Sequence, residues 1–223
     1  MKRILILAIA MLLIAGVAYA GILNSKHDMR SSLTASVPTG GYNEICVYCH
    51  TPHNAATTST TSPLWNRSVT TAATYIPYTS STMNNTMDAT LGPQSNACMT
   101  CHDGTLSVNA LKNTPLGTAG QGDNAPLTAA GLIVAGDTNF GSDLSNDHPV
   151  GITFSNTDDS GLYTLAEVQA KTTQVRLFGS STNQVECASC HNVHNPGLTS
   201  DGTAPFLKST NTASALCLAC HNK

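Results

Sequence analysis

The segment Cys46-Val-Tyr-Cys49-His50-Thr-Pro-His53 contains a pentapeptide pattern, C-x-x-C-H, that the chain repeats. The other copies are Cys98-Met-Thr-Cys101-His102, Cys187-Ala-Ser-Cys190-His191 and Cys217-Leu-Ala-Cys220-His221. C-x-x-C-H is the attachment pattern of c-type haem, in which two thioether bonds hold the macrocycle and the adjacent histidine becomes the proximal iron ligand. A single copy could belong to a redox motif or to half a zinc site. Because four copies use all eight cysteines, the sequence predicts four covalent haems and electron transfer.

Four further histidines complete the count of iron ligands: His27, His53, His148 and His194. With the four proximal histidines they match the two axial positions of four irons, so we expect every haem to be bis-histidinyl. Taken singly, a spare histidine is more often a solvated residue than a ligand. Methionine is the rival distal ligand. The candidates, Met29, Met83, Met87 and Met99, are more simply explained as gap-filling or exposed side chains.

The spacing of two spare histidines carries information about neighbouring haems. The form C-x-x-C-H-x-x-H occurs at Cys46–His53 and again at Cys187–His194. Three residues span at most about 10 Å, which is too short to carry the chain round the edge of a macrocycle. If His53 and His194 are ligands, each therefore binds a neighbouring haem rather than its own. The pattern predicts closely packed haems.

The histidines and motifs also form a twofold repeat along the chain. An upstream histidine, a C-x-x-C-H-x-x-H and a plain C-x-x-C-H occur over residues 27–102 and recur over residues 148–221. The natural pairing gives His53 to the haem of His102 and His194 to the haem of His221. His27 and His148 are then left for the haems of His50 and His191. That pairing is a hypothesis, and crossed pairings are the alternative.

The first twenty residues have the features of a cleaved signal peptide. Lys2 and Arg3 precede an apolar stretch, Ile4 to Val17, and Ala18-Tyr19-Ala20 matches the small-x-small cleavage rule. An uncleaved membrane anchor is the alternative, although the apolar stretch is somewhat short for a span. We expect a mature chain from Gly21 that is exported, without stable membrane insertion, to the cell surface or the extracellular space. The alternative location is the periplasm.

Residues 21–223 are expected to form a single tetrahaem domain. A first haem pair would come from residues 21–102, a haem-free insertion from about 103–147, and a second haem pair from 148–223. Charged residues make up 10% of the chain and aromatic residues 5%, a composition that ordinarily indicates weak folding. We therefore expect covalent haems and iron–histidine bonds to hold the fold together, and the haem-free chain to be unfolded.

The expected fold class is a multihaem cytochrome c, mostly irregular, with short helices and a small β-hairpin. Each C-x-x-C-H should form a short helical turn, and Leu162–Thr172 should form one or two more. Val175–Phe178 and Gln184–Glu186 are expected to pair as a hairpin. The aspartates of the insertion, which could bind calcium, are better explained by turn formation.

Several segments are similar to the multihaem cytochromes of metal-reducing bacteria. They are Glu44-Ile-Cys46-Val-Tyr-Cys49-His50-Thr-Pro-His53-Asn-Ala, Pro63-Leu-Trp-Asn-Arg67, Asp147-His148-Pro149-Val150-Gly151, Val185-Glu-Cys187-Ala-Ser-Cys190-His191 and Leu216-Cys217-Leu-Ala-Cys220-His221. With Ser25-Lys-His27-Asp28 near the mature N-terminus, the chain most resembles the OmcE-type tetrahaem cytochromes, which polymerise into extracellular filaments, the cytochrome nanowires. The resemblance implies a haem stack that continues between subunits and one axial histidine donated across each junction. His27 is the candidate donor, and ligation of His27 within its own chain is the alternative.

Three functions remain to be compared. The first is a polymeric conduit that carries electrons to metal oxides, other cells or other multihaem cytochromes. The second is a soluble, monomeric periplasmic shuttle. Shuttles usually dock through charged patches, and the low content of charged residues in this chain, 10%, therefore favours the conduit. The third is a catalytic multihaem enzyme, which needs an open iron position. Since a distal histidine is available for every haem, we expect an electron-transfer protein and no enzyme. The net charge of −3 gives no reason to expect a nucleic-acid partner.

Overall fold

The structure is a computed structural model of the chain, and it describes ten ranges of residues: 21–23, 25–29, 44–56, 64–67, 75–114, 127–128, 130–172, 174–179, 183–195 and 206–222. The expected signal peptide, residues 1–20, lies outside these ranges, as do residues 115–126 and 129 of the expected insertion.

Regular structure is sparse in the described residues. The helices are α2 (Pro93–His102), α3 (Leu165–Lys171), α4 (Cys187–Cys190) and α5 (Cys217–Cys220), with a 3₁₀ turn, η1 (Thr212–Ser214). The strands β1 (Ile152–Thr153) and β2 (Gln184–Val185) pair antiparallel, with Ile152 opposite Val185. Turns and bends connect these elements, so the expectation of a mostly irregular chain with short helices is confirmed.

The expected elements between residues 162 and 186 are present with altered details. Helix α3 falls within the predicted segment, and a capping box fixes its start: the Thr164 hydroxyl accepts from the Glu167 N–H, and the Glu167 carboxylate accepts from the Thr164 N–H. Phe178 and Gln184 exchange backbone hydrogen bonds of 2.9 and 2.7 Å, as the predicted hairpin requires. The ladder partner of β2 is nevertheless β1. The hairpin prediction missed it because β1 lies more than thirty residues upstream.

The buried apolar side chains of the described residues form three small clusters rather than one core. The first contains Met29, Tyr48 and Val108, the second Leu91, Met99 and Leu144, and the third Phe154, Val168 and Val175. Cys49 and Cys101 pack against the first cluster, and Cys220 packs against the third. The attachment motifs thus border the little apolar interior that the polypeptide itself provides.

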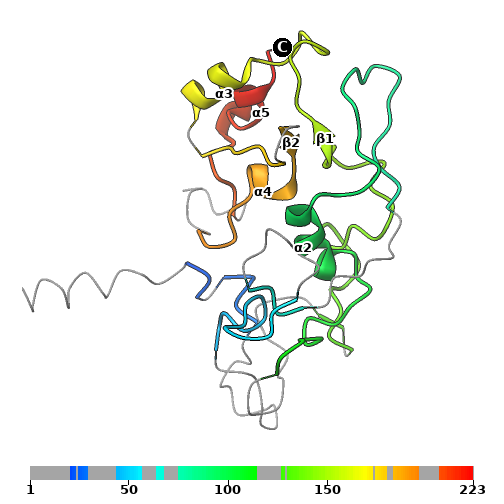
Figure 1. The fold of residues 1–223 in the computed structure, drawn as a ribbon, viewed down its shortest axis with the longest axis vertical. Helices are drawn as coiled ribbons and strands as arrows, with labels where there is room; N and C mark the ends of the chain where they lie inside the picture. The colour runs from blue at the N-terminus through cyan, green and yellow to red at the C-terminus, as the bar shows by residue number, and fades with distance from the viewer. Residues whose placement is uncertain are drawn as a thin grey trace, which may run out of the picture.

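Figure 1 shows how the motifs are arranged along the long axis of the molecule. The first motif, in cyan, lies toward one end, α2 and α4 follow near the middle, and α5 lies beside α3 toward the other end. The order of the motifs in space is therefore their order in the sequence.

Candidate haem-attachment sites

Each C-x-x-C-H forms a helical turn, as the sequence predicts. In the first motif the His50 N–H donates to the Cys46 carbonyl at 2.8 Å. The third and fourth motifs form α4 and α5, and their histidine N–H groups bond back to Cys187 and Cys217 at 3.1 and 2.9 Å. The second motif ends α2. Since residues three apart share one face of a helix, both cysteines of each motif can reach one macrocycle.

The cysteines of successive motifs are neighbours. Cys101 of the second motif lies close enough to Cys49 of the first to raise the pKa of Cys49. Cys98 of the second motif and Cys187 of the third are within hydrogen-bonding distance of each other. Cys190 of the third motif lies close enough to the fourth motif that Cys217 raises the pKa of Cys190 and Cys190 raises that of Cys220. Each motif thus has a cysteine near a cysteine of the next motif.

Three of the four motif histidines each face one of the spare histidines. The ring centroids of His102 and His27 are 6.1 Å apart. Those of His50 and His194 are also 6.1 Å apart, with the rings stacked at 17°. Those of His221 and His148 are 6.4 Å apart. Each pair thus joins one expected proximal ligand to one expected distal ligand.

These separations fit two imidazoles on opposite sides of one iron. An imidazole nitrogen binds a transition metal at about 2 Å and lies roughly 1 Å from the centre of its ring, which puts the two ring centres about 6 Å apart. The second motif also has the protonation that ligation needs. His102 Nδ1 lies 2.7 Å from the Thr138 carbonyl oxygen, and a carbonyl can only accept, so Nδ1 carries the proton and Nε2 is free to bind metal.

The electrostatic environment keeps two of the spare histidines neutral. Burial, with smaller contributions from His102 and His191, lowers the pKa of His27 to about 4. Burial likewise lowers the pKa of His194, with a smaller contribution from His50. An imidazole must be neutral to bind a metal. The surroundings of both side chains therefore suit a ligand.

The observed pairs differ from the natural pairing of the sequence repeat. His27 faces His102 rather than His50, His194 faces His50 rather than His221, and His148 faces His221 rather than His191. Only the pair of His194 and His50 joins the two halves of the chain, and a backbone bond of 2.9 Å from the Gly21 N–H to the His194 carbonyl likewise joins the N-terminal arm to the second half.

One expected distal ligand, His53, is not brought to a motif histidine in the described part of the chain. Its side chain is exposed, and its backbone is held by hydrogen bonds from Thr51 Oγ1 and Asn113 Nδ2 to its carbonyl, at 3.0 and 3.3 Å. The motif histidine that remains is His191, which is also exposed. His53 and His191 are the two candidate ligands outside the three facing pairs.

Aromatic side chains lie against three of the paired histidines. Phe206 is 4.5 Å from His27 between ring centroids, Phe140 is 5.7 Å from His102, and Trp65 is 6.2 Å from His50. Phe140 and Phe206 stand in polar segments without periodicity, so no local pattern in the sequence marks them.

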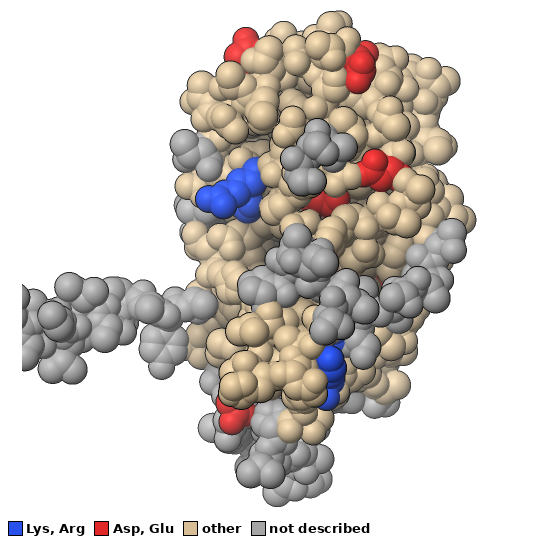
Figure 2. Space-filling model, viewed as in Figure 1, with Lys and Arg blue, Asp and Glu red and all other residues tan. Residues whose placement is uncertain are grey.

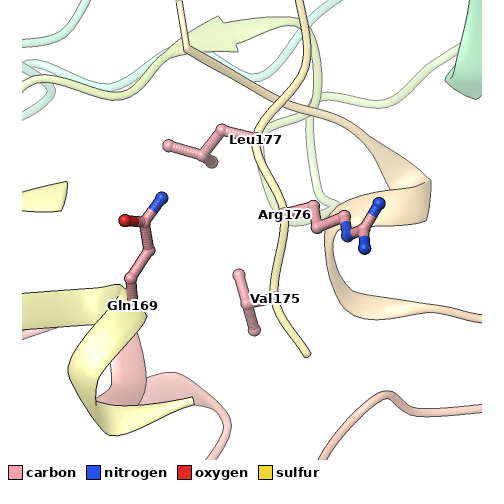
Figure 3. A pocket seen from close by; sticks show the side chains of 4 residues that line it. All are labelled: Gln169, Val175, Arg176 and Leu177. Atoms are coloured by element: carbon pink, nitrogen blue, oxygen red, sulfur yellow. The ribbon is translucent and has the colours of Figure 1, made fainter. Parts of the chain in front are cut away.

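A zinc–thiolate site fits these residues less well than haem. Zinc gathers four thiolate or imidazole ligands, whereas the described residues contain no group of three or more histidine, cysteine and acidic side chains able to share an ion. Burial also raises the pKa of Cys49 to about 12 and that of Cys220 to about 11. A hollow of about 480 Å³ beside α3 is lined by Gln169, Val175, Arg176 and Leu177 (Figure 3), and none of the candidate ligands lines it.

The chain matches no protein-family model, and no curated protein matches it. Among the described residues, none of the helices has the length and apolar character needed to cross a bilayer.

Proposed function

We propose that this chain is a tetrahaem c-type cytochrome that carries electrons along closely spaced, bis-histidine haems. The observation that supports it most strongly is the facing of His102, His50 and His221 by His27, His194 and His148 at 6.1, 6.1 and 6.4 Å. Haem supplies the redox chemistry, a one-electron change at iron. The chain holds each macrocycle through two cysteines and two histidines, and with both axial positions filled it conducts electrons rather than catalysing a reaction at iron.

The order of the motifs supports a single path for electrons. Cys49 neighbours Cys101, Cys98 neighbours Cys187, and Cys190 neighbours Cys220. Since each sulfur is bonded to the edge of its own haem, neighbouring sulfurs bring successive haem edges together. Electrons would pass from the first haem to the fourth in sequence order, with none of the four bypassed.

The surface favours a fixed conduit over a diffusing shuttle. Figure 2 shows few lysine, arginine, aspartate and glutamate side chains on the visible face, and those present are scattered. A soluble shuttle uses a patch of one charge to steer encounters with its partners. We therefore retain polymerisation of exported subunits into an extracellular filament as part of the proposal, and the monomeric periplasmic shuttle as its alternative.

The geometry changes which histidine is the candidate for donation between subunits. His27 lies 6.1 Å from His102 of its own chain, so it has a role without a second subunit. His53 is exposed, and it is not a member of the three facing pairs. In a filament, His53 is accordingly the better candidate to complete the haem of His191 in a neighbouring subunit.

One set of measurements tests whether the protein is a tetrahaem cytochrome, and another tests whether it forms filaments. The mass of the purified protein should exceed that of the polypeptide by four haems, and its absorption and EPR spectra should show low-spin iron only. Fewer haems, or high-spin iron in the wild-type protein, would refute the cytochrome. Electron microscopy tests the filament, and globular particles alone at high concentration would leave only the monomeric shuttle.

Variants of the two candidate histidines test the junction. His53→Ala should abolish filaments and leave one high-spin haem per subunit. His27→Ala should also produce one high-spin haem, at His102, but should retain filaments. The opposite result, filaments lost only with His27→Ala, would restore His27 as the donor.

A further inference from the structure

Arg67 is the largest side chain that is fully buried among the described residues, with 1% of its surface exposed. Its two terminal nitrogens donate to backbone carbonyls: Nη1 to Val108 and Nη2 to Ser107, both at 2.6 Å. Its third nitrogen, Nε, is buried without a hydrogen-bond partner. Two neutral carbonyls thus accept the hydrogen bonds of a permanently charged group.

The segment that carries Arg67 is anchored on both sides. Asn66 Nδ2 donates to the carbonyls of Val47 and Asn113, at 2.7 and 2.9 Å, and the Lys112 N–H donates to the Asn66 carbonyl at 2.8 Å. These bonds fix Arg67 between the first attachment motif and the segment that follows the second. The hydrogen bonds of the neighbouring Asn66 therefore hold the backbone at Arg67 in place.

The charge of Arg67 lies beside apolar side chains. Its Nη1 donates to the carbonyl of Val108, which forms a cluster with Met29 and Tyr48, and its Nε is buried without a hydrogen-bond partner. A buried charge is costly unless an opposite charge is near. The arrangement is understandable if Arg67 acts on negative charge that the haems bring.

Two cysteines from different motifs lie beside this charge. Cys49 and Cys101 both pack against the cluster that contains Val108, and Arg67 Nη1 donates to the Val108 carbonyl. Cys49 and Cys101 are expected to hold the first and second haems, respectively. Arg67 thus stands at the boundary between these two haems, where the low dielectric leaves its field weakly screened.

We propose that Arg67 sets the reduction potentials of the first two haems by stabilising their reduced state. Each iron gains one electron on reduction, from Fe(III) to Fe(II), and no bond is made or broken. The added negative charge is attracted by the buried guanidinium, so both potentials are higher than they would be without it. This inference rests on the proposed function, because it assumes haems at the first two motifs.

The second half of the chain offers a matched comparison. Arg176 is an exposed cation, and Figure 3 shows its guanidinium directed away from Gln169 and Leu177. An exposed charge is screened by water and salt. Arg176→Met therefore changes the formal charge of the chain by the same amount as Arg67→Met, but at an exposed position instead of a buried one.

The experiment is an optical redox titration of the fully loaded protein, made after the haem content of each variant has been counted. In Arg67→Met we expect two of the four transitions to move to more negative potential and the other two to stay. Arg67→Lys, which keeps the charge but not the forked hydrogen bonds, should titrate close to the wild type. Arg176→Met should match the wild type at all four haems.

Three outcomes would overturn the proposal. The first is an Arg67→Met protein with four haems and unchanged potentials. The second is an equal shift of all four haems. The third is a shift in Arg67→Lys as large as that in Arg67→Met, which would assign the effect to the hydrogen bonds with Ser107 and Val108.

A measurement on the wild-type protein covers the case in which Arg67→Met does not assemble. Paramagnetic NMR can assign each transition to a haem, and the haems of His50 and His102 should then titrate above that of His221, the haem at the opposite end of the series. The reverse order would overturn the proposal. Failure of the proposed function is distinguishable, because it would appear as missing haems or high-spin iron in the wild-type protein.

Discussion

Replacing Glu186 by alanine removes the contact that joins the second and third attachment motifs. Glu186 precedes Cys187, has 1% of its surface exposed, and accepts a hydrogen bond of 3.1 Å from the Gly92 N–H at the start of α2. In return, the Cys187 N–H donates to Ser95 Oγ of α2 at 2.9 Å. These bonds hold α2 against α4, where Cys98 and Cys187 meet.

The expected loss of stability follows from the bond and its surroundings. A hydrogen bond to a charged group contributes about 1.5–3 kcal/mol, and a buried donor left without an acceptor costs about 1–3 kcal/mol. The loss is partly offset because Glu186 Oε2 is buried without a hydrogen-bond partner. We expect Glu186→Ala to cost about 2 kcal/mol. Glu186→Gln, which retains an acceptor of the same shape, should cost less than about 1 kcal/mol.

The pH dependence of these variants has a definite sign. Burial raises the pKa of Glu186 above its ordinary value of 4.5, outweighing the hydrogen bonds from Ser95 and Gly92 that lower it. The folded protein therefore holds this proton to higher pH than the unfolded chain. The resulting stability is fully present below about pH 4.5 and is lost as pH rises through the folded pKa. The free energy of unfolding of the wild type, relative to Glu186→Gln, should fall over that window.

Guanidinium denaturation of the loaded proteins at about pH 4 and about pH 8 measures both effects. Glu44→Ala is the matched control, since Glu44 is an exposed glutamate two residues before the first motif. It should leave the free energy of unfolding unchanged. Equal stabilities of Glu186→Ala and the wild type at both pH values would refute the joining role, and a constant difference between the wild type and Glu186→Gln would refute the pH argument.

Other predictions concern the histidine pairs, a helix cap and the role of haem. His194→Ala should make the haem of His50 high-spin, and His148→Ala the haem of His221; EPR with NMR assignment checks this, and an exchange of the two haems would contradict the pairing. Thr164→Ala removes the cap of α3 and should cost about 1 kcal/mol in guanidinium denaturation, so an unchanged midpoint would count against it. The chain produced without haem attachment should be unfolded by circular dichroism, and a cooperative thermal transition would contradict that expectation.

Local features of this protein could be predicted from local sequence. The two cysteines and the histidine of each attachment motif are adjacent in the chain, and the helical turn that presents them closes through a bond between residues four apart, as from His50 to Cys46. Helix α3 is equally local, because Thr164 and Glu167 form its capping box within one turn. Spacing also predicted that His194 would not serve its own motif, and it lies beside His50.

The partners of three spare histidines, His27, His148 and His194, were decided only by the tertiary structure. His194 meets His50 across 144 residues of chain, and β1 meets β2 across α3. Contacts of this kind depend on which segments pack together, and a twofold repeat in the sequence is equally compatible with several pairings. The buried charge of Arg67 is a similar case, because an arginine in a polar segment carries no local mark of burial. The sequence by itself predicts the number of haems that we propose, since covalent attachment needs only neighbouring residues. The tertiary structure decides which histidines and charges surround each of them, since these come from segments far apart in the chain.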